Sequence, residues 1–202
     1  MYEDAAALRE ALFGNAVEGR QRAAAALGLS KGRNAQLGAA LALAFAGDAK
    51  RAQLLADDLG TRFPANTVVR FNFIPTIKAQ LELIRNDSSK AIETLQAAAP
   101  YEVGSLLGNR LYPAYVRGEA YLAAHRGIEA AAEFEKIIEH RGVVLNRPTG
   151  VLAHLGLARA YAMQGDTAKA KVAYRDFLTL WKDADPDIPI LKQAKLEYAK
   201  LP

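Results

Sequence analysis

The chain has 202 residues and a formal net charge of +4, and 51% of its residues are hydrophobic. Alanine, leucine and long charged side chains dominate while β-branched residues are sparse, which predicts an all-α fold and argues against an extensive sheet. Basic residues are interleaved with acidic ones and cysteine is absent, so we expect neither a nucleic-acid partner nor a disulfide or thiolate metal site.

Apolar residues recur at the helical spacing of three and four, and short turn signals interrupt them. These signals are AGDAK at 46–50, RNDSSK at 85–90, HRG at 125–127 and QGDTAK at 164–169. Asp48, Ser88 and Asp166 are the expected N-caps of the helices that follow them, because a short polar side chain can accept from first-turn amides.

We expect antiparallel helix pairs within a single domain, 1–202, at about 3–28, 33–62, 67–99, 110–141 and 149–182. A capping helix at about 187–201 would close the stack. Its shielding residues would be Ile188, Leu191, Ala194, Leu196 and Tyr198.

Two of these segments are copies of one pattern. YVRGEAYLAAHRGIEAAAEFEKII at 115–138 and LGLARAYAMQGDTAKAKVAYRDFL at 155–178 match at a constant offset of 40. Alanines in the same role follow one another at intervals of 39, 39 and 40, at Ala52, Ala91, Ala130 and Ala170. A unit that recurs in this way buries its apolar face against its own copies.

The repeat resembles the tetratricopeptide repeat. The family's large, small, Tyr, Gly, Ala and aromatic positions are matched by Leu157, Ala158, Tyr161, Gly165, Ala170 and Tyr174. Partial matches are Gly118, Tyr121, Ala130 and Phe134 in the preceding unit, and Ala40, Gly47, Ala52 and Pro64 in an earlier one. The spacing here exceeds the family's ~34 residues. The resemblance implies a right-handed superhelix, or α-solenoid, of antiparallel helix pairs.

Residues 110–201 resemble more specifically the C-terminal tetratricopeptide region of large bacterial proteins, common in acidobacteria. The phrases HRGVVLNRP, HLGLARAYA and WKDADPDIPIL carry this resemblance. The N-terminal part of those proteins is a serine/threonine protein kinase or sometimes a winged-helix DNA-binding domain. The resemblance implies a sensing or scaffolding module of a signalling protein.

Catalytic and metal-binding patterns are missing from the sequence. It has no Gly-rich phosphate loop, no His-Arg-Asp followed by Asn and no Asp-Phe-Gly, so we expect no enzymatic activity, no catalytic residues and no cofactor. His125, His140 and His154 lack metal-ligand spacing, which predicts no metal site. We expect His125 and His140 near helix C-termini, where a partly charged imidazole is favourable.

The tetratricopeptide resemblance also implies a concave groove, lined by the first helices of the pairs, that holds a peptide or protein segment. The candidate contacts are Asn34, Phe73, Thr76, Gln80, Tyr112, Tyr115, Glu119, Leu155 and Arg159. Phe73 and Leu155, like Leu37 and Leu41, could equally belong to the core. Four arginines could pair with an acidic peptide or with solvent and neighbouring acids, namely Arg70, Arg110, Arg117 and Arg159.

The start, MYEDAAALREALFGN, lacks the basic and apolar regions of a signal peptide, and no apolar run approaches membrane-spanning length, so we expect a cytoplasmic chain without a membrane segment. The favoured hypothesis is a non-catalytic protein-interaction module of a bacterial kinase. The alternative is a self-associating structural adaptor, a homo-oligomer. A small-molecule sensor is a third possibility.

Overall fold

The computed structural model describes residues 2–103 and 111–202, with Tyr2 described by its backbone alone, and every regular element in these ranges is helical. The predicted all-α class is confirmed. The α-helices are α1 (Tyr2–Leu12), α2 (Ala16–Leu29), α3 (Arg33–Phe45), α4 (Ala49–Arg62), α5 (Ile74–Ile84), α6 (Ser88–Gln96), α7 (Tyr112–Ala123), α8 (Gly127–Glu139), α9 (Arg141–Val144), α10 (Pro148–Met163), α11 (Thr167–Leu180) and α12 (Pro189–Ala199). A π-helix, η1 (Val69–Phe73), runs into α5, and a 3-10 helix, η2 (Ala99–Tyr101), follows α6.

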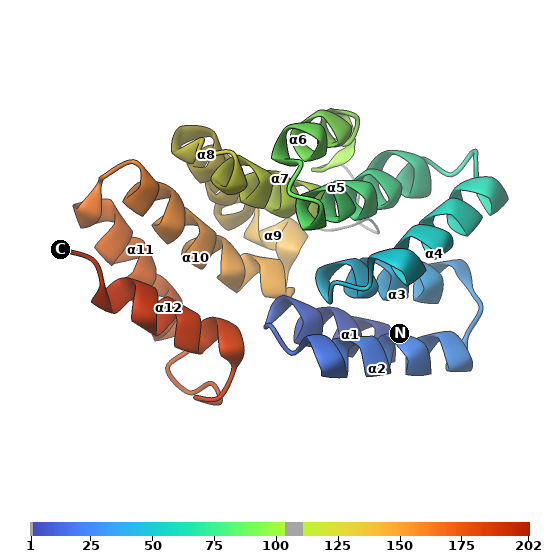
Figure 1. The fold of residues 1–202 in the computed structure, drawn as a ribbon, viewed down its shortest axis with the longest axis horizontal. Coiled ribbons are helices and arrows are strands. Elements are labelled where there is room, and N and C mark those ends of the chain that lie inside the picture. The colour runs from blue at the N-terminus through green and yellow to red at the C-terminus, as the bar shows by residue number, and fades with distance from the viewer. Residues whose placement is uncertain (1, 104–110) are drawn as a thin grey trace.

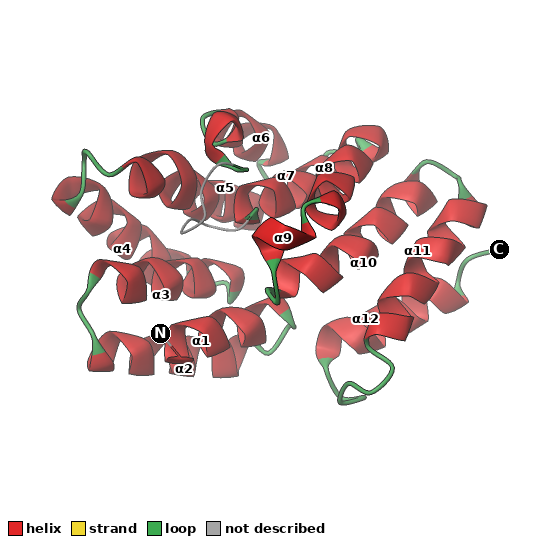
Figure 2. Ribbon diagram, turned by 180° about the vertical axis from the view of Figure 1, so that it is seen from behind, coloured by secondary structure: helices red, strands yellow, loops and turns green. Residues whose placement is uncertain are grey.

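Neighbouring helices pack as antiparallel pairs, in the order that the sequence predicts. The pairs are α1 with α2, α3 with α4, α5 with α6, α7 with α8, and α10 with α11, and α12 follows the last of them (Figure 1). The third pair begins with η1, within the predicted range 67–99, whereas α9 is an addition to the prediction and lies between the fourth and fifth pairs (Figure 2). No helix in the described ranges is both long and apolar enough to cross a bilayer.

All five pairs turn with the same backbone geometry. One residue of each turn has a left-handed φ, between 57° and 92°, at Gly14, Gly47, Asn86, His125 and Gly165. The next N–H donates to the carbonyl five residues back, at 2.8 to 3.0 Å, which is the Schellman arrangement that closes a helix. The last four of these positions are spaced 39, 39 and 40 residues apart, like the repeated alanines, so the turn repeats in register with the sequence.

The N-caps follow these turns at once. Asp48 and Asp166 accept from the amides of Arg51 and Lys169, as predicted. The prediction of Ser88 is wrong by one residue, because Asp87 accepts from the amide of Lys90 and Ser88 is the first helical residue. In these turns the residue with the left-handed φ ends one helix, and the aspartate directly after it caps the start of the next.

Small residues set the spacing between helices. The repeated Ala52, Ala91, Ala130 and Ala170 are all fully buried. The ring of Phe134, on α8, lies against Gly118 of α7 and Gly156 of α10, so one aromatic side chain fills the space left by two glycines. Close approach of this kind explains why the pattern demands small residues at fixed positions.

The pairs follow an arc that brings the turn between α1 and α2 next to the start of α12 (Figure 1). Phe13, in the turn between α1 and α2, meets Trp181 edge to face at 4.7 Å between ring centroids. The N–H of Ile190, at the start of α12, donates to the carbonyl of Phe13 at 3.2 Å. The first and last parts of the array are therefore in direct contact, and we call this contact, made by Phe13, Trp181 and Ile190, the end clasp.

The C-terminal helix caps the last pair with fewer residues than predicted. Leu191 and Ala194 are buried, and Ile188 and Tyr198 pack against the core. The prediction for Leu196 is wrong, because its side chain is 63% exposed on the outer face of α12.

Candidate functional site

The predicted groove residues divide into buried and accessible sets. Four of them, Thr76, Tyr112, Tyr115 and Leu155, are at most 8% exposed, so their assignment to an accessible surface is corrected. They belong to the interior of the array and offer a partner little or no surface. For Leu155 this is the core alternative that the sequence left open.

The arc is too tight for an open groove at these positions. Phe45 of α3 packs against both Tyr112 and Tyr115 of α7, at 6.5 and 6.3 Å between ring centroids. Tyr115 also contacts Phe134, at 6.0 Å. Helices α3 and α7 belong to pairs that are not neighbours, so the chain fills the space between its own first helices with aromatic side chains.

The other five candidates are partly accessible. Asn34 is exposed, and the remaining four are half-buried, namely Phe73, Gln80, Glu119 and Arg159. They lie on α3, η1, α5, α7 and α10 and do not form one cluster around a single cavity. Their role in binding stays a prediction.

Arg159 is already engaged by the capping helix. Its guanidinium donates to both carboxylate oxygens of Glu197, at 2.9 and 3.0 Å, and the hydroxyl of Tyr174 donates to the same carboxylate at 3.0 Å. Nearby, Oε1 of Glu119 is shielded and has no hydrogen-bond partner among the described residues. Burial raises the pKa of Glu119, and Arg159 partly opposes this.

Another of the four arginines, Arg117, is buried and hydrogen-bonded to two carboxylates. Arg117 is 3% exposed and binds Glu102 at 2.7 and 3.0 Å and Glu133 at 2.7 and 2.9 Å, both bidentate. Its pKa is raised although burial opposes this, because both carboxylates favour the cation. Arg117 therefore fastens the segment after α6 to α7 and α8 and is not free for an acidic partner. Arg70 is exposed over the ring of Phe71, and Arg110 lies outside the described residues.

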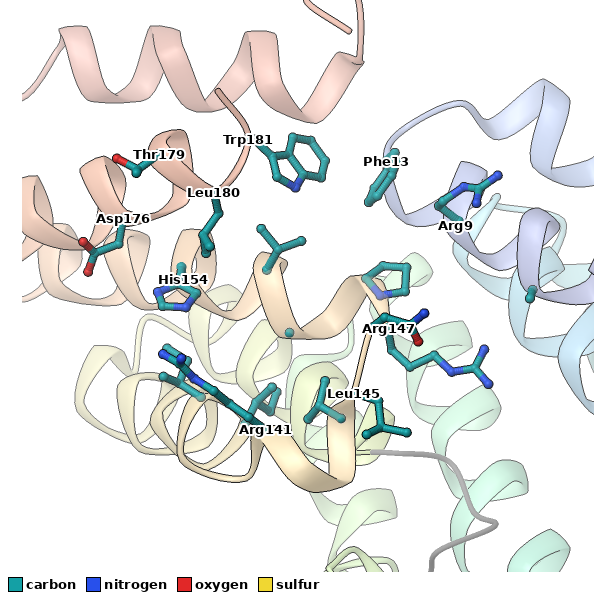
Figure 3. Close-up of a pocket in the computed structure, with 18 residues that line it drawn as sticks. Arg9, Phe13, Arg141, Leu145, Arg147, His154, Asp176, Thr179, Leu180 and Trp181 are labelled. Atoms are coloured by element: carbon teal, nitrogen blue, oxygen red, sulfur yellow. The ribbon is translucent and has the colours of Figure 1, made fainter. Parts of the chain in front are cut away.

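A cavity in the described part of the chain lies elsewhere, next to the end clasp. It has a volume of about 860 Å³ and is open to solvent. Its walls come from α1 and the turn after it, from the end of α8, from the connection that includes α9, from α10, which carries His154, and from the C-terminal end of α11 (Figure 3). The charged and titratable residues in these walls are Arg9, Arg141, Arg147, His154 and Asp176. Large apolar residues include Phe13, Val144, Leu145, Leu180 and Trp181.

The two ends of this cavity differ in chemistry. Arg141 extends toward His154 and Asp176 at one end, whereas Phe13 and Trp181 face each other at the other (Figure 3). Burial lowers the pKa of His154, Asp176 opposes the change and Arg141 adds to it. Since the pKa lies below its ordinary value of 6.5, the imidazole is neutral at pH 7.

The aromatic end is rigidly built. Trp181 contacts Phe177 at 5.0 Å in addition to Phe13, so its indole is held from two sides. Phe177 is fully buried. An aromatic pair held in this way offers a preformed apolar wall to a ligand.

The segment after α9 has an unusual backbone. Leu145 has φ 55° and ψ −133°, a conformation suited to glycine, and its side chain is 60% exposed. Strained residues persist where the surrounding structure or a function demands them. A strained, exposed leucine in the wall of a cavity is therefore a second indication that this region binds something.

Sequence reasoning did not find this cavity, although a signal was present. The residues RGVVLNRPTG, 141–150, lie between two predicted helix pairs of an array whose spacing exceeds ~34 residues. They form α9, the strained turn and the start of α10, which together make one cavity wall. Within the described ranges, no group of three or more His, Cys, Asp or Glu side chains is placed to hold a metal ion.

Comparisons with protein-family models, with curated proteins and with solved structures found no match to this chain.

Proposed function

We propose that the chain is a non-catalytic protein-interaction module that holds a short segment of a partner protein in the cavity beside the end clasp. The observation that carries the proposal is the cavity itself. Its volume, about 860 Å³, is in the range of preformed ligand sites, and such sites combine apolar walls with a few polar groups, as here. Leu145 and Leu180 supply apolar surface that remains 60% and 59% exposed in the unliganded chain.

The repeat supports the architectural part of the proposal. Turns of one geometry at intervals of 39, 39 and 40 residues indicate a tetratricopeptide-like array, an α-solenoid of helix pairs. Arrays of this kind present surfaces built from several units, and binding of extended segments is their common use.

The wider setting rests on the sequence resemblance of residues 110–201. On that basis the chain is a C-terminal region of a cytoplasmic bacterial serine/threonine kinase, and the bound segment would belong to a substrate or regulator of that kinase. The phrases HRGVVLNRP and WKDADPDIPIL support this assignment, and both contribute to the cavity region, through Arg141 to Pro148 and through Trp181.

Selection from a phage-displayed library of random octapeptides tests the proposal. Three forms of the chain are used: the wild type, Leu180→Trp, which places a bulky side chain in the cavity, and Leu196→Trp as a matched control. Leu180 and Leu196 have similar exposure, 59% and 63%, and only Leu180 lines the cavity. We expect peptides that bind the wild type and Leu196→Trp with equal affinity and bind Leu180→Trp at least about tenfold more weakly. Selected peptides that bind all three forms equally would contradict the proposal.

A further inference from the structure

The cavity carries positive charge that the described structure does not neutralise. Three arginines line it against a single carboxylate, Asp176. Arg9 has Glu10 at 3.6 Å, but Arg141 and Arg147 have no ion pair within the described residues. Nε of Arg147 is shielded from solvent and lacks a hydrogen-bond partner there. Arg141 is exposed, so an anionic ligand can reach its guanidinium and form charge-assisted hydrogen bonds.

The start of α10 adds to this potential. Pro148 and Gly150, in its first turn, line the cavity, and no side chain caps this helix. The N-terminus of a helix of 16 residues carries a partial positive charge. Arg147 and this helix end thus add positive potential on one side of the cavity, and Arg141 adds it on the other side, beside His154 (Figure 3).

Apolar surface lies within reach of this charge. Phe13 and Trp181 form the opposite end of the cavity, and Leu180 lies between them and His154 (Figure 3). A ligand that satisfies only the charge leaves this surface in water, and one that is only apolar leaves the arginines unpaired. A ligand that carries an acidic group close to a large apolar group can pair with the arginine at one end of the cavity and cover the aromatic side chains at the other.

We infer that the segment held in the cavity is acidic and amphipathic: an aspartate or glutamate carboxylate binds Arg141 beside His154, and a neighbouring large apolar side chain packs against Phe13 and Trp181. This inference rests on the proposed function. The guanidinium of Arg141 matches a carboxylate with two parallel hydrogen bonds. The imidazole of His154, neutral at pH 7, donates a further one. Asp176 repels a second acid at that end and so limits the number of acids bound there.

The test uses the selected octapeptides themselves as probes. Each is synthesised with an acetylated N-terminus, an amidated C-terminus and a fluorescein label, and a second version replaces every Asp and Glu by Asn and Gln. Fluorescence anisotropy then measures the affinity of both versions for the wild type and for Arg141→Gln.

The peptides are expected to be enriched in Asp or Glu next to Leu, Phe, Tyr or Trp. On the wild type, replacing the acids by amides should weaken binding at least about tenfold, the worth of one charge-assisted hydrogen bond. On Arg141→Gln the same replacement should change binding less than about twofold, because the partner of the acid is gone. Binding of the acidic version should also weaken as salt is added.

The two proposals fail in different ways. Peptides that depend on the cavity, by the Leu180→Trp comparison, but contain no acid or are indifferent to its replacement would overturn this inference and leave the proposed function standing. If acid replacement weakened binding to the wild type and to Arg141→Gln equally, the acid would not bind Arg141, and the inference would also be overturned. Peptides that do not depend on the cavity at all would overturn the proposed function, and the inference with it.

Discussion

The ring of Phe134 occupies the space that a side chain on Gly156 would need. A Cβ built on Gly156 would lie 2.7 Å from Cδ1 of Phe134, and one built on Gly118 would lie 2.7 Å from Cζ. Phe134 is fully buried and cannot turn away without opening the contact between α7, α8 and α10. We expect Gly156→Ala to lower the free energy of unfolding by about 1–3 kcal/mol, the usual cost of overpacking, as measured by urea denaturation.

Gly28→Ala is the matched control for this substitution. Gly28 lies near the end of α2, is exposed, and has nothing within 4 Å of a Cβ. The free energy of unfolding should rise by up to about 1 kcal/mol, because alanine favours a helix more than glycine does. If the two substitutions changed stability in the same direction, the packing of Phe134 between the two glycines would be refuted.

The ion cluster around Arg117 should be sensitive to loss of one partner. Among the described residues, Arg117→Met leaves Glu102, whose side chain is 1% exposed, with only the weaker contact to Lys136 at 3.4 Å. An uncompensated buried carboxylate costs several kcal/mol, so we expect a loss of about 3–5 kcal/mol in the free energy of unfolding. Replacing the carboxylate as well, in Arg117→Met with Glu102→Leu, should restore much of that loss.

Arg126→Met provides the comparison. Arg126 pairs with Glu129 at 2.7 Å, but both side chains are exposed, at 49% and 41%. Its replacement should cost less than about 1 kcal/mol. Equal losses for Arg117→Met and Arg126→Met would show that the Arg117 cluster is not shielded as described.

The repeated turn predicts a stabilising substitution. His125 has φ 57° at a position where Gly47 and Gly165 stand in the equivalent turns. Since glycine adopts this conformation without steric cost, His125→Gly should raise the free energy of unfolding by about 1 kcal/mol and raise the melting temperature. Asn86→Gly should raise the free energy of unfolding by less, because asparagine tolerates the left-handed region better than histidine does. A loss of stability in His125→Gly would contradict the common turn geometry.

The titration of His154 gives the stability a defined pH dependence. Its pKa is lowered in the folded chain, chiefly by burial, so the unfolded chain takes up a proton first as the pH falls below about 6.5. Proton uptake by the unfolded chain favours unfolding, so the contribution of His154 to stability is complete above that pH and is lost as the pH falls through the folded-state pKa.

We therefore expect the free energy of unfolding of the wild type to fall more steeply between pH 7.5 and pH 5.5 than that of His154→Gln. Urea denaturation at the two pH values gives both slopes, and other titrating groups contribute equally to each protein. Equal slopes would show that His154 is not desolvated in the cavity wall.

Most of the helical framework follows from local sequence rules. The apolar period, the Gly or Asn before an Asp in three of the turns, and the repeated alanines define the helix pairs, and α3 and α4 begin and end where the sequence predicts. Even the one-residue error at Ser88 is local, because Asp87 and Ser88 are both competent caps and only the backbone of the turn selects between them.

The candidate site could not be predicted in the same way. Whether Tyr112 and Tyr115 face solvent or Phe45 depends on how tightly the stack curves, which is a sum of small rotations between pairs that no single repeat encodes. The cavity depends on contact between Phe13 and Trp181, which lie at opposite ends of the chain. Repeats predict contacts between neighbouring units, and the end clasp is not such a contact.

The central claim, that a partner segment occupies the cavity beside the end clasp, is tested most directly at Trp181, the only tryptophan of the chain. The measurement is quenching of its fluorescence by acrylamide during titration with a tryptophan-free octapeptide that binds the wild type. We predict that Trp181 becomes protected from the quencher, with the same dissociation constant that anisotropy gives. Saturated binding by anisotropy with unchanged quenching of Trp181 would place the peptide elsewhere and contradict the account.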